Sequence, residues 1–117
     1  MKIAVIDDSQ FMRGLIVAGL GQIYPAASVV EFADPAEALR ALPTLRPDLI
    51  TLDLLMPGLS GFQVLEQLGG LSLHARIVVI TADVQPSVRQ RCAAAGVHAF
   101  VEKPVTLEKL RAALASP

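Results

Sequence analysis

Short apolar runs alternate with amphipathic stretches five times along the 117 residues of this chain. The apolar runs predict strands at residues 2–6, 28–33, 48–53, 76–81 and 99–103. The stretches that follow them predict helices at residues 10–23, 35 to about 43, 61–70, 86–95 and 107–115. A helix between two strands returns the chain to the start of the sheet, so such strands run parallel. The sequence therefore predicts a doubly wound α/β fold, a five-stranded parallel sheet with helices on both faces.

Several residues mark the expected ends of helices. Ser9 and Asp34 directly precede predicted helices, where a side-chain oxygen can accept a hydrogen bond from the first turn. Ser60 is followed three residues later by Gln63, which is the spacing of a capping box. Pro43 has no backbone N–H and is expected to end the second helix there. These signals predict helix boundaries independently of the hydrophobic pattern.

Composition and charge narrow the class of protein. Hydrophobic residues make up 53% of the chain and charged residues 18%, which favours a packed core over disorder. We expect a single domain spanning residues 1–117. The formal net charge of -1 supplies no basic field, so no direct nucleic-acid partner is expected. No apolar run approaches the length of about 18 residues that a membrane span needs, so we expect a cytoplasmic protein without membrane insertion.

Polar residues stand at the carboxyl ends of four predicted strands. They are Asp7 and Asp8 after the first strand, Asp53 at the third, Thr81 at the fourth and Lys103 at the fifth. Parallel strands end at the same edge of a sheet, and ligands of open α/β sheets bind beyond that edge. We therefore expect these five side chains to form one site.

Three carboxylates in one place repel each other, and a hard divalent cation with oxygen ligands is the simplest way to keep them ionised. The sequence therefore predicts a Mg²⁺ site held by Asp7 and Asp8. A carboxylate beside Mg²⁺, with a hydroxyl and a lysine nearby, is suited to accept a phosphoryl group. Asp53 is the best nucleophile because it stands alone after the central strand. Lys103 would offset the charge on the transferring group, and Thr81 would donate a hydrogen bond to it.

Four motifs in this order identify a known family. They are "VIDDS" with Arg13 following, "LDLLMPGLSG", "ITA" and "EKP". Over nearly its whole length the chain resembles the receiver domain of two-component response regulators, of which chemotaxis regulators are the single-domain type. The resemblance implies a flavodoxin-like fold with strand order 2-1-3-4-5.

The resemblance also implies roles for the acidic residues. Asp53 is similar in position to the phosphorylated aspartate, and Asp8 to a direct Mg²⁺ ligand. Asp7 would act on the metal directly or through a water molecule. The main-chain carbonyl of Leu55 would complete the protein's share of the metal shell.

Further roles follow from the resemblance for the last two strands. Lys103 is similar to the lysine that contacts the phosphoryl oxygens, and its bond to Pro104 is expected to be cis. Thr81 resembles the hydroxyl that moves to meet the phosphoryl group and draws Phe100 inward as the switch aromatic. The residues alone leave a second interpretation open, in which Phe100 is a buried anchor for the last helix.

The implied function is a signalling switch rather than an enzyme. A sensor histidine kinase or phosphotransfer protein would phosphorylate Asp53, and the changed surface would signal to an effector protein or to an output domain absent from this sequence. The chain would catalyse its own phosphotransfer and slow autodephosphorylation. Leu55 cannot position a water for hydrolysis, whereas Asp83 could either orient one or serve only as a residue at the entry to a helix.

Two other functions use the same elements. A Mg²⁺-dependent phosphatase of the haloacid-dehalogenase type also forms a phosphoaspartate, but it usually carries a second aspartate where Leu55 stands. A flavin-binding domain shares the strand order, but no hydroxyl-rich or glycine-rich phosphate loop follows the first strand.

Overall fold

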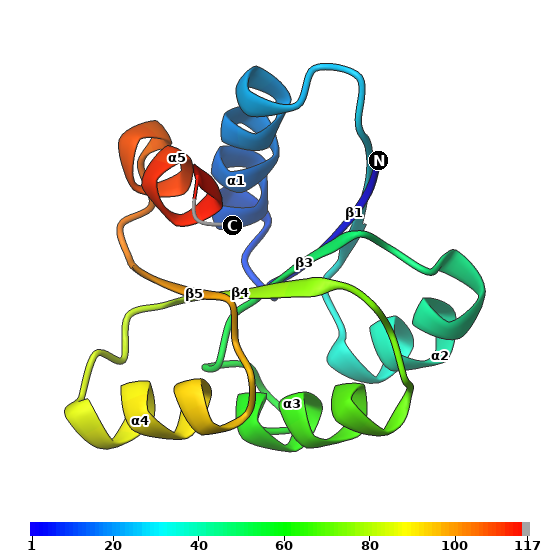
Figure 1. Ribbon diagram of the computed structural model, residues 1–117, viewed down its shortest axis with the longest axis vertical. Coiled ribbons are helices and arrows are strands. Elements are labelled where there is room, and N and C mark those ends of the chain that lie inside the picture. The colour runs from blue at the N-terminus through cyan, green and yellow to red at the C-terminus, as the bar shows by residue number, and fades with distance from the viewer. Residues whose placement is uncertain (116–117) are drawn as a thin grey trace.

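The computed structural model describes residues 1–115, which form the predicted doubly wound α/β fold (Figure 1). The parallel sheet has the order β2-β1-β3-β4-β5, so β3 is central and β5 lies at an edge. The strands are β1 (Lys2–Ile6), β2 (Ser28–Phe32), β3 (Leu49–Leu52), β4 (Arg76–Thr81) and β5 (Ala99–Glu102). The helices are α1 (Gln10–Ile23), α2 (Pro35–Leu45), α3 (Gly61–Gly70), α4 (Pro86–Ala94) and α5 (Leu107–Ala115). The last two residues of the expected domain, 116–117, lie outside the described residues.

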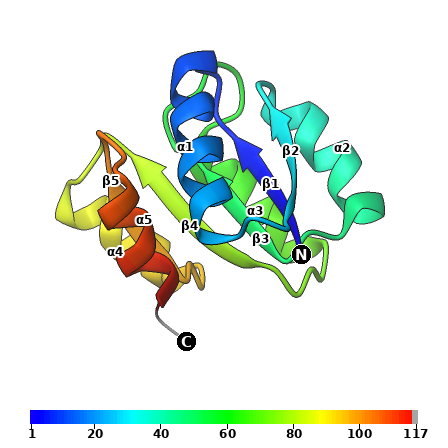
Figure 2. The ribbon, with the colours of Figure 1, turned by 90° about the horizontal axis from the view of Figure 1, so that it is seen from above.

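The helices form a layer on each face of the sheet (Figures 1 and 2). Helices α1 and α5 cover one face, while α2, α3 and α4 cover the other. The residues of β1 alternate between the two layers: Ile3 and Val5 pack with α1 and α5, and Ala4 and Ile6 pack with the other three helices. All four are at most 1% exposed, as a parallel strand buried on both faces requires.

Most predicted helix boundaries are confirmed, although α4 ends one residue early, at Ala94, and α2 differs further. Ser9 accepts a hydrogen bond from the Met12 N–H at 3.2 Å, and Ser60 caps α3 in a complete capping box. Helix α2, however, does not end at Pro43 but continues to Leu45. Pro43 lies in the last turn, where its missing N–H removes a single helical hydrogen bond, and Leu45 packs against the core just beyond it.

Hydrogen bonds extend the sheet past the ends of three strands. The Asp7 N–H donates to Phe32 O at 3.1 Å, the Asp53 N–H to Ile6 O at 3.0 Å, and the Lys103 N–H to Thr81 O at 2.9 Å. The residues that follow β1, β3 and β5 are therefore held in register at one edge. Strand β1 ends at Ile6 as predicted, whereas β3 and β5 each end one residue earlier than predicted.

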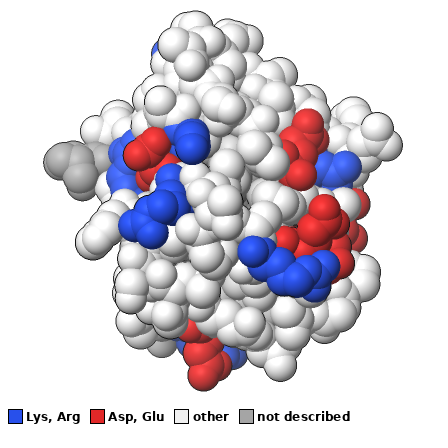
Figure 3. All heavy atoms as spheres, turned by 90° about the vertical axis from the view of Figure 1, so that its right-hand side faces the viewer, with Lys and Arg blue, Asp and Glu red and all other residues white. Residues whose placement is uncertain are grey.

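The surface carries both charge signs. On the face shown in Figure 3, basic and acidic side chains lie in mixed clusters rather than in one basic patch. None of the helices in residues 1–115 is long and apolar enough to cross a membrane.

Candidate functional site

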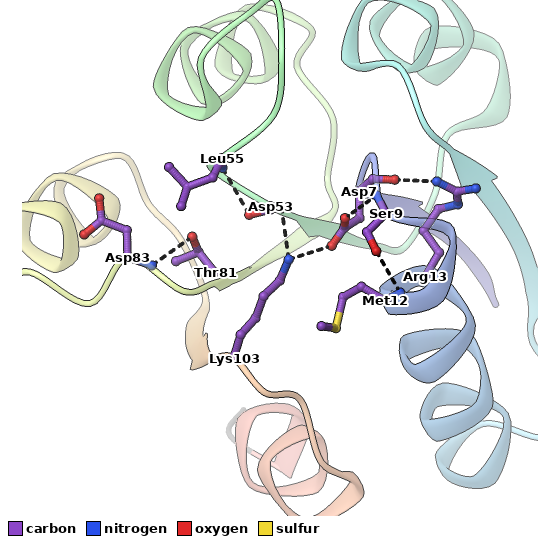
Figure 4. A network of polar contacts seen from close by, with 9 residues as sticks. All are labelled: Asp7, Ser9, Met12, Arg13, Asp53, Leu55, Thr81, Asp83 and Lys103. Carbon is purple, nitrogen blue, oxygen red and sulfur yellow. Dashed lines mark hydrogen bonds and ion pairs between the residues drawn. The ribbon is translucent and has the colours of Figure 1, made fainter.

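Four of the predicted site residues lie together at the carboxyl edge of the sheet (Figure 4). Asp7 follows β1 and is 1% exposed, Asp53 follows β3 and is 4% exposed, and Thr81 at the end of β4 is fully buried. Lys103 follows β5 and reaches over this edge toward both aspartates. Asp8, beside Asp7, is exposed. The topology thus collects polar groups that are up to 96 residues apart in the sequence.

The three aspartates form a group that could hold a metal ion. One carboxylate oxygen from each of Asp7, Asp8 and Asp53 lies within 4.8 Å of the others. Carboxylate oxygens are the ligands that Mg²⁺ prefers, and this ion uses one or two carboxylates together with waters or phosphate oxygens. The donor set therefore fits the magnesium ion that the sequence predicts.

Lys103 is the counter-charge of the buried carboxylates. Its ammonium donates to Asp7 Oδ2 and to Asp53 Oδ2, both at 3.1 Å. The Lys103 side chain is 16% exposed, so this double ion pair is largely shielded from water. One ammonium facing three carboxylates leaves the site with an excess of negative charge, which favours a bound cation.

The pKa values of Asp53 and Lys103 follow from burial and from this pairing. Burial raises the pKa of Asp53, and the Leu55 N–H and the Lys103 ammonium only partly oppose it. Burial also acts to lower the pKa of Lys103, but its hydrogen bonds to Asp7 and Asp53 outweigh that effect, so the pKa is raised. Lys103 therefore stays charged at neutral pH, whereas ionised Asp53 is held at a cost in free energy.

Local hydrogen bonds orient the two buried carboxylates. Asp7 Oδ1 accepts from the Ser9 N–H at 2.9 Å, and Asp53 Oδ1 accepts from the Leu55 N–H at 3.1 Å. In each carboxylate, one oxygen thus accepts a hydrogen bond from the backbone N–H two residues later, and the other accepts one from the Lys103 ammonium. Leu55 is 56% exposed and lies outside the core.

Thr81 and Asp83 are linked to the loop before α4. The Thr81 hydroxyl oxygen accepts from the Asp83 N–H at 3.3 Å, and Asp83 Oδ1 accepts from the Gln85 N–H at 3.3 Å. The Asp83 carboxylate therefore supports the entry to α4, which favours the structural interpretation of this residue over a water-orienting role.

Phe100 is half-buried on the edge strand and packs against the core beneath α4. The Arg89 guanidinium of α4 lies over the Phe100 ring, 4.6 Å from its centroid. The ring is only half-buried and packs with the layer of α2, α3 and α4, on the sheet face opposite to α5, which does not support the interpretation of Phe100 as a buried anchor for the last helix. The expected cis bond between Lys103 and Pro104 is present.

Sequence reasoning missed the roles of two residues. Arg13 occurs in the first motif, yet its contact with the Asp7 carbonyl, at 2.7 Å, was not predicted. Gly61 allows close packing of α3 on the loop after Asp53, because a Cβ atom there would clash with the Cα of Leu54. A glycine directly after a helix cap was the one sequence signal for this approach.

Comparison with known proteins shows the family. The response regulator receiver domain family matches residues 3–115, so this chain belongs to that family. It is 33% identical over 114 residues to the cyclic di-GMP phosphodiesterase response regulator RpfG of Xanthomonas campestris pv. campestris, covering 96% of this chain and 30% of that protein. The chain thus spans about a third of the length of that relative.

Solved structures agree with this assignment. The Vibrio cholerae chemotaxis protein CheY4 has a TM-score of 0.87 and 28% identity, covering 97% of this chain and 95% of that one. The receiver domain of RcsB from Salmonella enterica serovar Typhimurium, solved with the phosphomimetic BeF3-, has a TM-score of 0.88 and 26% identity, covering 98% and 86%.

Membership of this family defines the general role of the chain. It is a receiver domain of two-component systems, homologous to phosphoacceptor response regulators. Receiver domains are signalling switches that pair with histidine kinases and bind Mg²⁺ at an acidic site.

Proposed function

We propose that Asp53 accepts a phosphoryl group from a sensor histidine kinase or a phosphotransfer protein. The single observation that carries this proposal is the contact of one ammonium, that of Lys103, with both Asp7 and Asp53 at 3.1 Å, beside a group of three carboxylates. Such an arrangement suits the transfer of an anionic group onto a carboxylate, because it supplies positive charge where negative charge gathers. The match to the receiver family over residues 3–115 supports the same assignment.

In the proposed reaction, a carboxylate oxygen of Asp53 forms a bond to phosphorus while the bond between phosphorus and the donor histidine nitrogen breaks. The Lys103 ammonium, which already contacts Asp53, would contact the phosphoryl oxygens and offset their charge. Asp7 and Asp8, with Asp53 and the main-chain carbonyl of Leu55, would hold Mg²⁺. Bound there, the ion would supply further positive charge to the transferring group.

The proposed switch joins Thr81 and Phe100. Thr81 Oγ1 accepts a hydrogen bond from the Asp83 N–H in the unphosphorylated protein. After phosphorylation, the Thr81 hydroxyl would donate a hydrogen bond to the phosphoryl group on Asp53. Phe100 would then move toward the space that Thr81 leaves, which changes the surface of β5 and α4 that an effector protein or an output domain reads. Phosphorylation can favour that arrangement only through contacts that the unphosphorylated site lacks.

The proposed function includes slow autodephosphorylation, the hydrolysis of the phosphoryl group on Asp53. The exposed apolar side chain of Leu55 offers no group to orient an attacking water, and Asp83 Oδ1 is engaged by the Gln85 N–H. Leu55 also stands where a phosphatase of the alternative class would carry its general acid, so the switch is favoured over a turnover enzyme.

The proposal is tested by titrating Mg²⁺ and then beryllofluoride into the protein while following backbone amide chemical shifts. We expect Mg²⁺-dependent changes near Asp8, Asp53 and Lys103 that spread to Phe100 on addition of beryllofluoride. In parallel, a small phosphodonor should label the wild-type protein but not Asp53→Asn, with Asp83→Asn as the matched control. Labelling of Asp53→Asn would overturn the acceptor assignment.

A further inference from the structure

Arg13, the fourth residue of α1, is linked to the acidic site through the backbone. Its Nη1 donates to the main-chain carbonyl of Asp7 at 2.7 Å, and its Nε donates to Glu31 Oε1 on β2 at 3.1 Å (Figure 4 shows the contact with Asp7). The Arg13 side chain is only 13% exposed, so its guanidinium is held against the protein rather than extended into water.

The carbonyl that Arg13 contacts belongs to the peptide that joins Asp7 to Asp8. The ladder between β1 and β2 ends with the pair Ile6 and Phe32, and the Asp7 N–H makes the last sheet bond. Beyond this point the Asp7 side chain is fixed by Ser9 and Lys103. The exposed Asp8 side chain extends from the far end of the peptide, so the orientation of that peptide sets where its carboxylate lies.

We infer that Arg13 is a positioning residue for the metal site, which holds the peptide between Asp7 and Asp8 so that the Asp8 carboxylate faces those of Asp7 and Asp53. This inference rests on the proposed function, in which these carboxylates hold Mg²⁺. The geometry suits arginine because its planar fork directs two N–H groups at two fixed acceptors at once. Glu31, whose side chain is 47% exposed, adds little energy as an ion-pair partner but fixes the plane of the guanidinium.

If Arg13 acts only through its charge, its replacement should change the affinity for Mg²⁺ in the opposite direction from that expected if it positions Asp8. This difference makes the inference testable. Removing a cation near three carboxylates should strengthen the binding of a divalent cation by Coulomb attraction alone. Loss of positioning should weaken it, because groups that orient metal ligands typically contribute about 10-fold or more in affinity. The sign of the change in affinity therefore distinguishes the two roles.

The experiment measures the Mg²⁺ dissociation constant from amide chemical shifts in the unphosphorylated protein. Arg13→Met should bind Mg²⁺ about 10-fold more weakly than wild type, with a urea midpoint in EDTA close to that of wild type. Arg13→Lys keeps the charge without the fork and should have an intermediate affinity. Arg40→Met, on the exposed side of α2, removes an arginine away from the site and should bind as wild type does.

Unchanged or tighter Mg²⁺ binding by Arg13→Met would overturn the inference and leave the proposed function intact. If Arg13→Met does not fold, Arg13→Lys decides instead, because affinity equal to that of wild type would exclude positioning by the fork. Failure of the wild-type protein to bind Mg²⁺ would overturn the metal site of the proposed function and the role of Arg13 with it.

Discussion

Lys103 donates to Asp53 Oδ2 at 3.1 Å across 50 residues of sequence, and the same ammonium contacts Asp7 Oδ2 at the same distance. A single cation thereby joins the ends of β1, β3 and β5. The residue that is proposed to contact the phosphoryl group is thus also the counter-charge of the buried site before phosphorylation.

Replacement of Lys103 should therefore destabilise the metal-free protein. Lys103→Met leaves two buried carboxylates without their counter-charge, and we expect the free energy of unfolding to fall by about 3 kcal/mol. Urea denaturation in EDTA measures this loss, and added Mg²⁺ should recover part of it. Lys2→Met removes an exposed lysine and serves as the control. An equal loss in both variants would contradict the pairing as a source of stability.

Asp53→Asn should stabilise the metal-free protein at neutral pH. Burial raises the pKa of Asp53 above its ordinary value of 3.8. Between the ordinary pKa and the folded pKa, the Asp53 carboxyl therefore binds more protons in the folded protein than in the unfolded chain. The stability of the wild-type protein therefore falls as the pH rises from the ordinary pKa through the folded one, whereas the variant lacks this effect. The gain in stability of Asp53→Asn over wild type should be absent below the ordinary pKa of the carboxyl group and complete above its folded pKa.

The measurement is the free energy of unfolding of wild type and Asp53→Asn in EDTA at several pH values between about 3 and 8. This range extends to both sides of the ordinary carboxyl pKa. Glu66→Gln, an exposed substitution on α3, is the control for a general effect of net charge. A stability difference between wild type and Asp53→Asn that does not change with pH would show that ionisation of Asp53 is not its cause.

Two glycines of α3 should respond in opposite ways to alanine. Gly61→Ala places a methyl group against the Leu54 backbone, and such overpacking should cost about 1–3 kcal/mol. Gly69→Ala meets open space and should gain about 0.5–1 kcal/mol, because alanine loses less chain entropy in a helix. Thermal unfolding compares the two.

The effect of Gly61→Ala should reach the acceptor site. Leu54 directly follows Asp53, and the Gly61 N–H donates to Leu54 O at 3.2 Å. Gly61→Ala should therefore weaken beryllofluoride binding while Gly69→Ala leaves it unchanged. Unaltered binding by both variants would mean that this loop tolerates displacement.

Arg89 should restrain the Phe100 ring. A cation over an aromatic ring at an exposed site is worth about 0.5–1 kcal/mol, which corresponds to about a two- to five-fold change in a conformational equilibrium. In Arg89→Met, without phosphorylation, Phe100 ring resonances should shift part of the way toward their beryllofluoride-bound positions. Arg91→Met removes a similar contact on the same helix, 3.6 Å from the Phe62 ring centroid, and should not move them. Identical Phe100 resonances in Arg89→Met and wild type would exclude this restraint.

Much of the fold was predictable because its signals are local. The alternation of apolar runs and helical stretches predicted the element order, and Ser9 and Ser60 marked the starts of α1 and α3 correctly. Pro43 misled because a proline in the last turn of a helix removes only one hydrogen bond, so packing by Leu45 decided where α2 ends. Local propensity yields to tertiary contacts of this kind at helix ends.

The sequence by itself determined the fold and which side chains reach its carboxyl edge, because the residues that end parallel strands must gather there. Only the tertiary structure decided how those side chains share their charges. It placed Lys103 between Asp7 and Asp53, and Arg13 on the Asp7 carbonyl. These contacts depend on distances between segments far apart in the chain, set by the register of the sheet and the packing of α1, and no local pattern encodes them.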